Sequence, residues 1–341
     1  MKTFEHGGDV TAFAKDCKCN VSEIIDLSSN INIVKPQVNI NFNRLNIAPY
    51  PNYDALYASI ASHYHVNTEE IELFNGASSA IFSLFRLLKE RHKELPLHCT
   101  LYSPAYLEYK KAATLFGYKI ININRYKNIM QEVEAESLIV FVNPATPDGI
   151  SYNIEKLLNR WIAKKCTILI DESFLEFTDT PSMSHHIKNY DKLYILKSMT
   201  KFYGAAGIRI GVLLSNIKNI TLLKTYEPNW KISALDSYYI QKVLKDKTLK
   251  KRTKRQLEET KIKLLSMFNH CTYVEKIYPS QANYLLLKLK NINAIDFQTL
   301  LAKEKILIRN CTNFEGLDEF HVRIAIKDNT SITALKKALY A

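Results

Sequence analysis

Short apolar runs alternate along this chain with longer segments in which apolar residues recur every three or four positions. Four runs in the middle of the chain are apolar along most of their length, at residues 137–144, 166–174, 192–201 and 208–214. Strands of this kind are covered on both faces, so they predict a parallel or mixed sheet with helices on each side. Residues 74–91 begin with small and polar residues and continue with an apolar stripe at helical spacing, which predicts a helix. The pattern therefore predicts an α/β fold.

From about residue 248 the pattern changes to that of a smaller α+β unit. A long basic helical segment at 245–263 precedes a strand at 281–289, two strands around a glycine-containing turn at 305–327, and a final helix. We expect three parts: an N-terminal segment (1–44) that joins the smaller unit, a large ligand-binding unit (45–240) and the smaller C-terminal unit (241–341).

Composition narrows the class of protein. The chain has 341 residues, of which 47% are hydrophobic and 23% charged, which is ordinary for a globular enzyme. No apolar run approaches the roughly 20 residues that cross a bilayer, and the start, MKTFEHGGDV, is unlike a signal peptide. We therefore expect a cytoplasmic protein without membrane contact. The six cysteines include one C-x-C pair and no matching second pair, so we expect free thiols and no metal site.

The net charge of +12 makes nucleic acid the first partner to consider. However, the densest basic run, residues 245–263, is typical of a solvated helix face, and no nucleic-acid-binding motif accompanies it. We expect no nucleic-acid partner. Positive charge also attracts small anionic ligands, and the candidate site residues favour that interpretation.

Several chemically distinct side chains follow the predicted strands, and ligands bind at the carboxyl ends of such strands. Asp171, Lys201 and the loop after Asn143 all lie there. Burial among small residues would lower the pKa of Lys201 and make it a nucleophile. Arg209 indicates a nearby oxyanion, and the helix start after Gly76 suits a phosphate, although a plain capped helix would look the same. An amine, an acid and phosphate donors are what pyridoxal 5′-phosphate requires for its aldehyde, ring nitrogen and phosphate.

The motif S-x-T-K-x-x-G-x-x-G-I-R-I-G at 198–211 resembles the Schiff-base segment of fold-type I aminotransferases. Segments that resemble other landmarks of that family are NPATPDG (143–149), IDESF (170–174) and SPAYLEY (103–109). Segments similar to one subfamily, the threonine-phosphate decarboxylases of cobalamin biosynthesis, are HGGD (6–9), DLSSNIN (26–32) and LIRNCTNFEGLD (307–318). The resemblance covers essentially the whole chain. It implies the fold-type I architecture, with a mixed, mostly parallel sheet in a large domain and a smaller C-terminal domain.

The resemblance also implies roles for individual residues. Lys201 would bind the cofactor aldehyde, Asp171 would pair with the ring nitrogen, and Tyr106 would stack on the ring. The other residues implied to bind the cofactor are Gly76, Ala77, Ser78, Thr146, Ser198, Arg209 and, from the other subunit of a homodimer, Tyr50. The residues implied to bind the substrate are His6, Gly7, Asn30, Arg309 and Arg323.

Three departures from the resemblance stand out. Thr146 occupies the position of an asparagine that bonds the phenolic oxygen of the cofactor ring. Phe174 occupies a position where histidinol-phosphate aminotransferases usually have tyrosine. Residues 33–35, Ile-Val-Lys, replace a Pro-Leu-Gly segment of the subfamily.

The implied reaction is decarboxylation of a small phosphorylated amino acid. O-phospho-L-threonine would give aminopropanol phosphate, and O-phospho-L-serine would give ethanolamine phosphate. These substrates differ by one methyl group, which is worth only about 1–3 kcal/mol in a pocket, so the sequence does not choose between them. The alternatives are a histidinol-phosphate aminotransferase and a non-catalytic binding or regulatory protein on the same fold.

Overall fold

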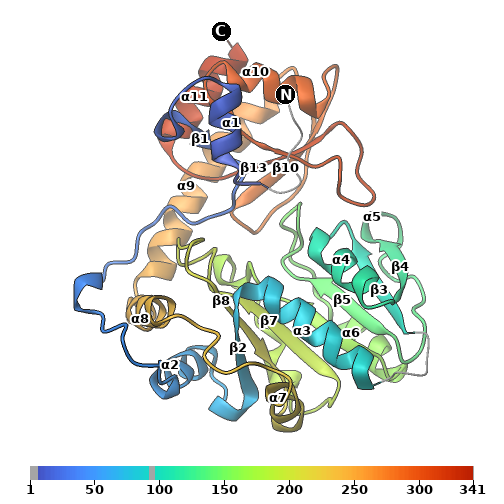
Figure 1. The fold of residues 1–341 in the computed structure, drawn as a ribbon. Helices are drawn as coiled ribbons and strands as arrows, with labels where there is room; N and C mark the ends of the chain where they lie inside the picture. Colours follow the sequence, from blue (N-terminus) through green and yellow to red (C-terminus); the bar gives the residue numbers. More distant parts are fainter. Residues whose placement is uncertain (1–6, 92–96, 341) are drawn as a thin grey trace.

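A computed structural model of the chain describes residues 7–91 and 97–340. Figure 1 shows a large unit and a smaller unit, connected by the long helix α9 (Leu249–Asn269), which runs from one into the other. The N-terminal segment begins beside the smaller unit and then descends along the large unit. The two units therefore share the first part of the chain as well as α9.

The large unit is built on a seven-stranded mixed sheet. In spatial order the strands are β2 (Ile71–Asn75), β8 (Ile210–Leu214), β7 (Leu193–Ser198), β6 (Thr167–Asp171), β5 (Leu138–Val142), β3 (His98–Ser103) and β4 (Lys119–Asn124). β8 runs antiparallel to both of its neighbours, β2 and β7, and the other pairings in this sheet are parallel. The predicted α/β fold with a mixed, mostly parallel sheet is confirmed. The sequence predicted β5 to β8 as strands but neither the reversed direction of β8 nor the strands β2, β3 and β4.

Helices cover both faces of this sheet, because the side chains of each strand alternate between two apolar cores. Alternate residues of β5, such as Val140, pack with α3 (Gly76–Arg91), α4 (Leu107–Leu115) and α7 (Ile217–Lys224). The intervening residues, such as Phe141, face α2 (Asp54–Tyr64), α6 (Glu155–Ala163) and α8 (Ala234–Val243). A short helix, α5 (Arg125–Asn128), follows β4. The predicted helix at 74–91 is α3.

The smaller unit contains a four-stranded antiparallel sheet. Its strands, in order, are β12 (Arg309–Asn310), β13 (His321–Ala325), β10 (Tyr284–Leu289) and β9 (Val274–Ile277), and its helices are α10 (Ala294–Ala302) and α11 (Asn329–Tyr340). The predicted strand pair around a turn corresponds to β12 and β13. After α1 (Val10–Asp16), β1 (Ile25–Asp26) pairs in parallel with β11 (Ile306–Leu307). This pairing attaches the N-terminal segment to the smaller unit, while the exact domain bounds remain a prediction.

No helix within the described ranges is both long and apolar enough to cross a membrane. All six cysteines are free thiols.

Candidate active site

A cavity of about 450 Å³ lies where the carboxyl ends of the large sheet face the smaller unit. Residues of the N-terminal segment, of the large unit and of β12 and β13 line this cavity. The predicted site residues that line it are Gly7, Asn30, Ala77, Ser78, Tyr106, Thr146, Asp171, Ser198, Lys201, Arg209, Arg309 and Arg323. The fold therefore brings together residues that lie up to about 300 positions apart in the sequence.

Asp171 is the last residue of β6 and is buried at the floor of the cavity. The hydroxyl of Tyr109 donates a hydrogen bond of 2.7 Å to its Oδ2, and the backbone N–H of Ser173 donates one of 2.8 Å to its Oδ1. Burial, followed by the charge of Asp171, raises the pKa of Tyr109, so this hydroxyl stays a donor. The carboxylate is thus fixed in orientation, as required of a group that pairs with a cationic ring nitrogen.

Lys201 lies in the loop that follows β7, and its Nζ is 5.0 Å from the centre of the Phe174 ring. Burial lowers the pKa of Lys201 below its ordinary value, and the charges of Arg323 and Arg209 lower it further, whereas Asp171 acts in the opposite sense. Since a neutral amine is the nucleophile, this environment prepares Lys201 to attack an aldehyde.

The first turn of α3 and the side chain of Arg209 form one end of the cavity. A Cβ atom on Gly76 would lie 2.4 Å from Nη2 of Arg209, and one on Gly211 would lie 2.5 Å from the backbone nitrogen of Ala77. Only glycines allow the guanidinium and β8 to come so close to the helix start. The backbone N–H groups of that turn have no partners within the helix, and Ser198 adds a hydroxyl at the cavity wall. Together these groups suit a phosphate.

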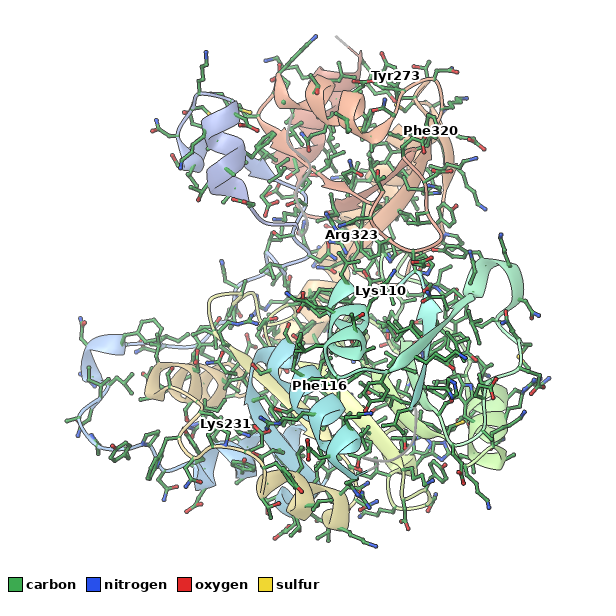
Figure 2. All side chains as sticks on the ribbon, turned by 45° about the vertical axis from the view of Figure 1, so that its right-hand side comes forward. Lys110, Phe116, Lys231, Tyr273, Phe320 and Arg323 are labelled. Carbon is green, nitrogen blue, oxygen red and sulfur yellow. The ribbon has the colours of Figure 1, made fainter. Side chains whose placement is uncertain are left out.

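The smaller unit contributes two buried arginines. Arg309 of β12 lies directly opposite Arg323 of β13 in the antiparallel ladder, so both side chains leave the same face of the sheet. Figure 2 shows Arg323 at the level where the two units meet. Nη2 of Arg309 donates to Oδ1 of Asn313 at 2.8 Å. The smaller unit thus places two guanidinium groups in the wall of the cavity.

Arg323 is held by neutral acceptors. Its Nη1 donates to the hydroxyl of Thr146 and its Nη2 to the carbonyl of Ser28, both at 3.1 Å. The amide oxygen of Asn30, when turned toward the guanidinium, accepts from Nη1 at 3.0 Å. No carboxylate of the described residues forms an ion pair with Arg323, and burial lowers its pKa. A buried cation with neutral partners is costly, so an anionic ligand would stabilise it.

The aminotransferase class I and II family matches residues 22–339 of the sequence. This chain belongs to that family. The bifunctional adenosylcobalamin biosynthesis protein CobDQ of Leptospira interrogans is 29% identical over 96% of this chain, which spans 40% of that protein's length. The threonine-phosphate decarboxylase of Salmonella typhimurium is 27% identical, with 98% of this chain and 95% of the relative covered. The solved histidinol-phosphate aminotransferase of Clostridium acetobutylicum superposes with a TM-score of 0.80 at 29% identity, covering 92% of this chain and 97% of that one.

Members of the aminotransferase class I and II family use pyridoxal phosphate, and the cavity fits it. The buried amine of Lys201 suits the aldehyde, and the fixed carboxylate of Asp171 suits the ring nitrogen. Arg209, Ser198 and the start of α3 suit the phosphate. Tyr106 lines the cavity, where its hydroxyl is 3.4 Å from Oγ of Ser78.

Thr146 lines the cavity, and its side chain is shorter than that of the asparagine that the resemblance places at this position. Its hydroxyl oxygen accepts the bond from Arg323, and the same hydroxyl also interacts with the phenol of the buried Tyr284. The expected ring contact of Thr146 therefore remains a prediction. The structure shows a different contact of Thr146, the hydrogen bond from Arg323. This bond links the loop after β5 to the smaller unit.

Two of the predicted residues that the structure describes, Tyr50 and Gly76, do not line the cavity. Tyr50 is 76% exposed and stacks on Trp230 at 4.3 Å between ring centres, away from the cavity of its own chain. Any contact of Tyr50 with cofactor therefore requires a second subunit. Gly76 does not line the cavity but makes room for Arg209. His6 lies outside the described residues.

The buried ion pair of Arg125 and Asp148 was not predicted from the sequence. Their side chains are 2% and 0% exposed, and Nη2 of Arg125 lies 2.8 Å from Oδ2 of Asp148. Arg125 also donates to the carbonyls of Pro104 and Thr146, and the hydroxyl of Tyr126 donates to Asp148 at 2.6 Å. This pair fixes the loop of Thr146 to the segment that leads into α4.

Proposed function

We propose that this chain uses pyridoxal phosphate to decarboxylate O-phospho-L-threonine or O-phospho-L-serine. The products would be aminopropanol phosphate or ethanolamine phosphate. The similarity to CobDQ and to the Salmonella threonine-phosphate decarboxylase supports the proposal, as does the resemblance of residues 307–318 to that subfamily.

The observation that carries the proposal is the pair of buried arginines at one end of the cavity. Arg309 and Arg323 lie opposite one another, and the partners of Arg323 are neutral oxygens. A substrate with a phosphate group offers several charged oxygens to such a pair, and guanidinium groups bind these oxygens in a fixed geometry. The N-terminal segment, through Gly7 and Asn30, closes the same end of the cavity.

The way in which the cavity orients the substrate determines which of the substrate's bonds breaks. The bound cofactor supplies an electron sink that weakens the bonds at the substrate's Cα. Only the bond held perpendicular to the ring plane benefits, so the outcome depends on how the protein orients the substrate. In this proposal, Arg309 and Arg323 bind the substrate's phosphate, and this binding turns the substrate's carboxylate out of the ring plane. The bond between Cα and the carboxylate carbon then breaks, and carbon dioxide leaves. The electron pair of that bond remains on the Cα side.

A proton must then return to Cα. The Nζ of Lys201 lies in the same cavity, at the carboxyl end of the sheet where the ring would sit. It is the basic group best placed to hold a proton there, and its lowered pKa makes the amine readier to release that proton. Phe174, next to this amine, offers no competing hydroxyl.

A histidinol-phosphate aminotransferase is the second candidate. The solved aminotransferase of Clostridium acetobutylicum is as similar to this chain as the decarboxylase relatives are, which favours it. Phe174 argues against it, because the resemblance places tyrosine there in those aminotransferases. An aminotransferase would hold a carboxylate in the ring plane and present the Cα–H bond to Lys201.

Product analysis tests the proposal. The cofactor-loaded protein is incubated with each phosphorylated amino acid, and the phosphorylated amine is quantified against a Lys201→Ala control. We expect amine from at least one substrate and none from the control. If histidinol phosphate with 2-oxoglutarate gives an oxo product, and neither phosphorylated amino acid gives an amine, the protein is an aminotransferase and the proposed decarboxylase is wrong.

We also propose a homodimer in which Tyr50 reaches the cofactor phosphate of the partner subunit. Its exposure, 76%, and its stacking on the half-exposed Trp230 support an interface at this place. Light scattering should give the mass of a dimer, and Tyr50→Phe should weaken cofactor binding without changing that mass. A wild type with the mass of a monomer, or a Tyr50→Phe variant that binds cofactor as tightly as the wild type, would exclude this role.

A further inference from the structure

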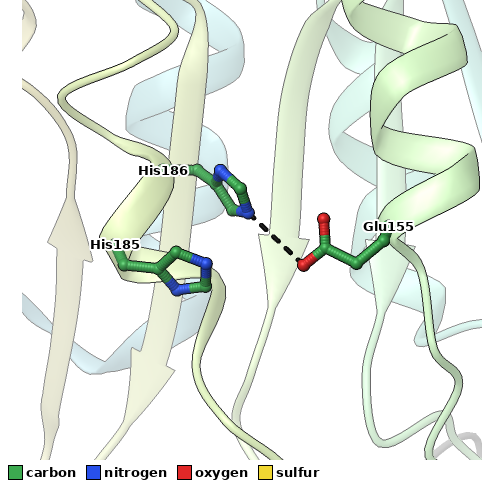
Figure 3. Close-up of side chains that lie close together, drawn as sticks. All are labelled: Glu155, His185 and His186. Carbon is green, nitrogen blue, oxygen red and sulfur yellow. Dashed lines mark hydrogen bonds and ion pairs between the residues drawn. The ribbon is translucent and has the colours of Figure 1, made fainter.

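Two adjacent histidines and a glutamate converge on the surface of the large unit (Figure 3). His185 and His186 end the 3-10 helix η5 (Met183–His186), and Glu155 is the first residue of α6. Each residue offers one ligand atom, and these atoms lie within 4.8 Å of one another. None of the three lines the active-site cavity, so the cluster is independent of the proposed reaction.

The spacing of these atoms suits a small tetrahedral ion. Nε2 of His186 lies 3.4 Å from Oε1 of Glu155. An ion with bonds of about 2.1 Å places tetrahedral ligand atoms about 3.4 Å apart. The rings of His185 and His186 are 4.0 Å apart between centres, so the two imidazoles lie beside one another at the end of η5. The side chains are 22% exposed for His186 and 51% for Glu155, so an ion can enter from solvent.

A second contact fixes the tautomer of His185. Its Nδ1 lies 2.8 Å from the backbone carbonyl of Ser182. Since a carbonyl only accepts, Nδ1 carries the proton and the lone pair is on Nε2. Ser182 is itself anchored, because its hydroxyl donates to Oε2 of the buried Glu172 at 2.6 Å. A ligand histidine whose other nitrogen bonds to a fixed carbonyl is the usual arrangement in metal sites.

We propose that Glu155, His185 and His186 form a binding site for a divalent transition-metal ion of the zinc class. Two neutral imidazoles and one carboxylate are a known donor set for Zn²⁺, with water in the fourth position. Imidazole ligands favour such ions over Mg²⁺ and Ca²⁺, which prefer oxygen. The ion would join η5 to the start of α6. Binding to the folded state alone would therefore stabilise the large unit.

The test uses tag-free, cofactor-loaded protein from which free cofactor has been removed. Bound Zn²⁺ is measured by equilibrium dialysis for the wild type, for His185→Ala combined with His186→Ala, and for Glu155→Gln. His270→Ala is the matched control, because His270 is also exposed and its Nδ1 also faces a backbone carbonyl, that of Ser266, at 2.8 Å. Sites elsewhere, including the thiols of Cys17 and Cys19, contribute equally to all four proteins.

We expect the wild type and His270→Ala to bind one more equivalent of Zn²⁺ than the double variant. Glu155→Gln should weaken this equivalent about tenfold or more, since even changes outside the ligand set cause losses of that size. Zn²⁺, but not Mg²⁺, should raise the Tm of the wild type more than that of the double variant. Equal stoichiometry and equal Tm shifts in all four proteins would overturn the proposal. Equal Tm values without metal show that the variants are folded, and the near-isosteric Glu155→Gln tests the site independently.

Discussion

Replacement of Gly76 by alanine should separate cofactor binding from folding. Gly76 has a φ of +80°, which costs an L-residue about 1–2 kcal/mol. The new Cβ would also lie 2.4 Å from Nη2 of Arg209, whereas ordinary contacts begin at 3.4 Å, so the guanidinium must move by about 1 Å. A hydrogen bond to a charged group contributes about 1.5–3 kcal/mol. Loss of the bond from Arg209 to the phosphate should therefore raise the cofactor Kd about 10- to 150-fold.

Gly117 provides the matched control for this substitution. Its φ is +69°, but a Cβ there would meet nothing within 4 Å. Gly117→Ala therefore carries the same backbone cost without the contact with Arg209. Denaturant titrations should show both variants destabilised by similar amounts, while titration of the apoenzymes with pyridoxal phosphate should show a raised Kd for Gly76→Ala alone. Equal cofactor affinities in the two variants would refute the assignment of Arg209 to the phosphate.

Three further predictions concern the active site and its support. Burial lowers the pKa of Lys201 below its ordinary value of 10.5, so between these two pKa values Lys201 binds fewer protons in the folded apoenzyme than in the unfolded chain. The free energy of unfolding should therefore rise with pH over that range. Lys201→Met should abolish that rise in urea titrations, and an unchanged slope would contradict the pKa shift. Arg323→Gln should lower kcat/KM for the phosphorylated amino acid about 10- to 150-fold, whereas Arg255→Gln, whose side chain is 82% exposed, should leave it unchanged. Arg125→Met leaves the carboxylate of Asp148 buried without its cation, so the free energy of unfolding should fall by about 3–5 kcal/mol; a loss below about 1 kcal/mol would show that Asp148 finds another partner.

Sequence reasoning located the catalytic end of the cavity because its residues follow local rules. Asp171 ends an apolar strand, and Lys201 follows another. Strands that run in the same direction bring their carboxyl ends to one edge, so the meeting of these two residues was predictable. The direction of β8 was not, because an apolar run has the same pattern in either direction.

The supporting contacts were beyond the sequence because they join distant segments. Arg125 and Asp148 are 23 residues apart and meet only when β4 and the loop after β5 are in place. The bond between Thr146 and Arg323 spans 177 residues and depends on how the smaller unit sits over the sheet. Tyr109 lay within a recognised segment, yet its bond to Asp171 follows from the packing of α4 on the sheet.

The fate of two labelled atoms tests the central claim most directly. O-phospho-L-threonine labelled with ¹³C in the carboxyl group and with deuterium on Cα is given to the cofactor-loaded protein, and the products are analysed by mass spectrometry. If the arginines turn the carboxylate out of the ring plane, the ¹³C should leave as carbon dioxide and the amine should retain its deuterium and gain one solvent proton. Retention of ¹³C together with loss of deuterium to solvent would mean that the Cα–H bond is the one held perpendicular, which contradicts the decarboxylase and identifies aminotransferase chemistry.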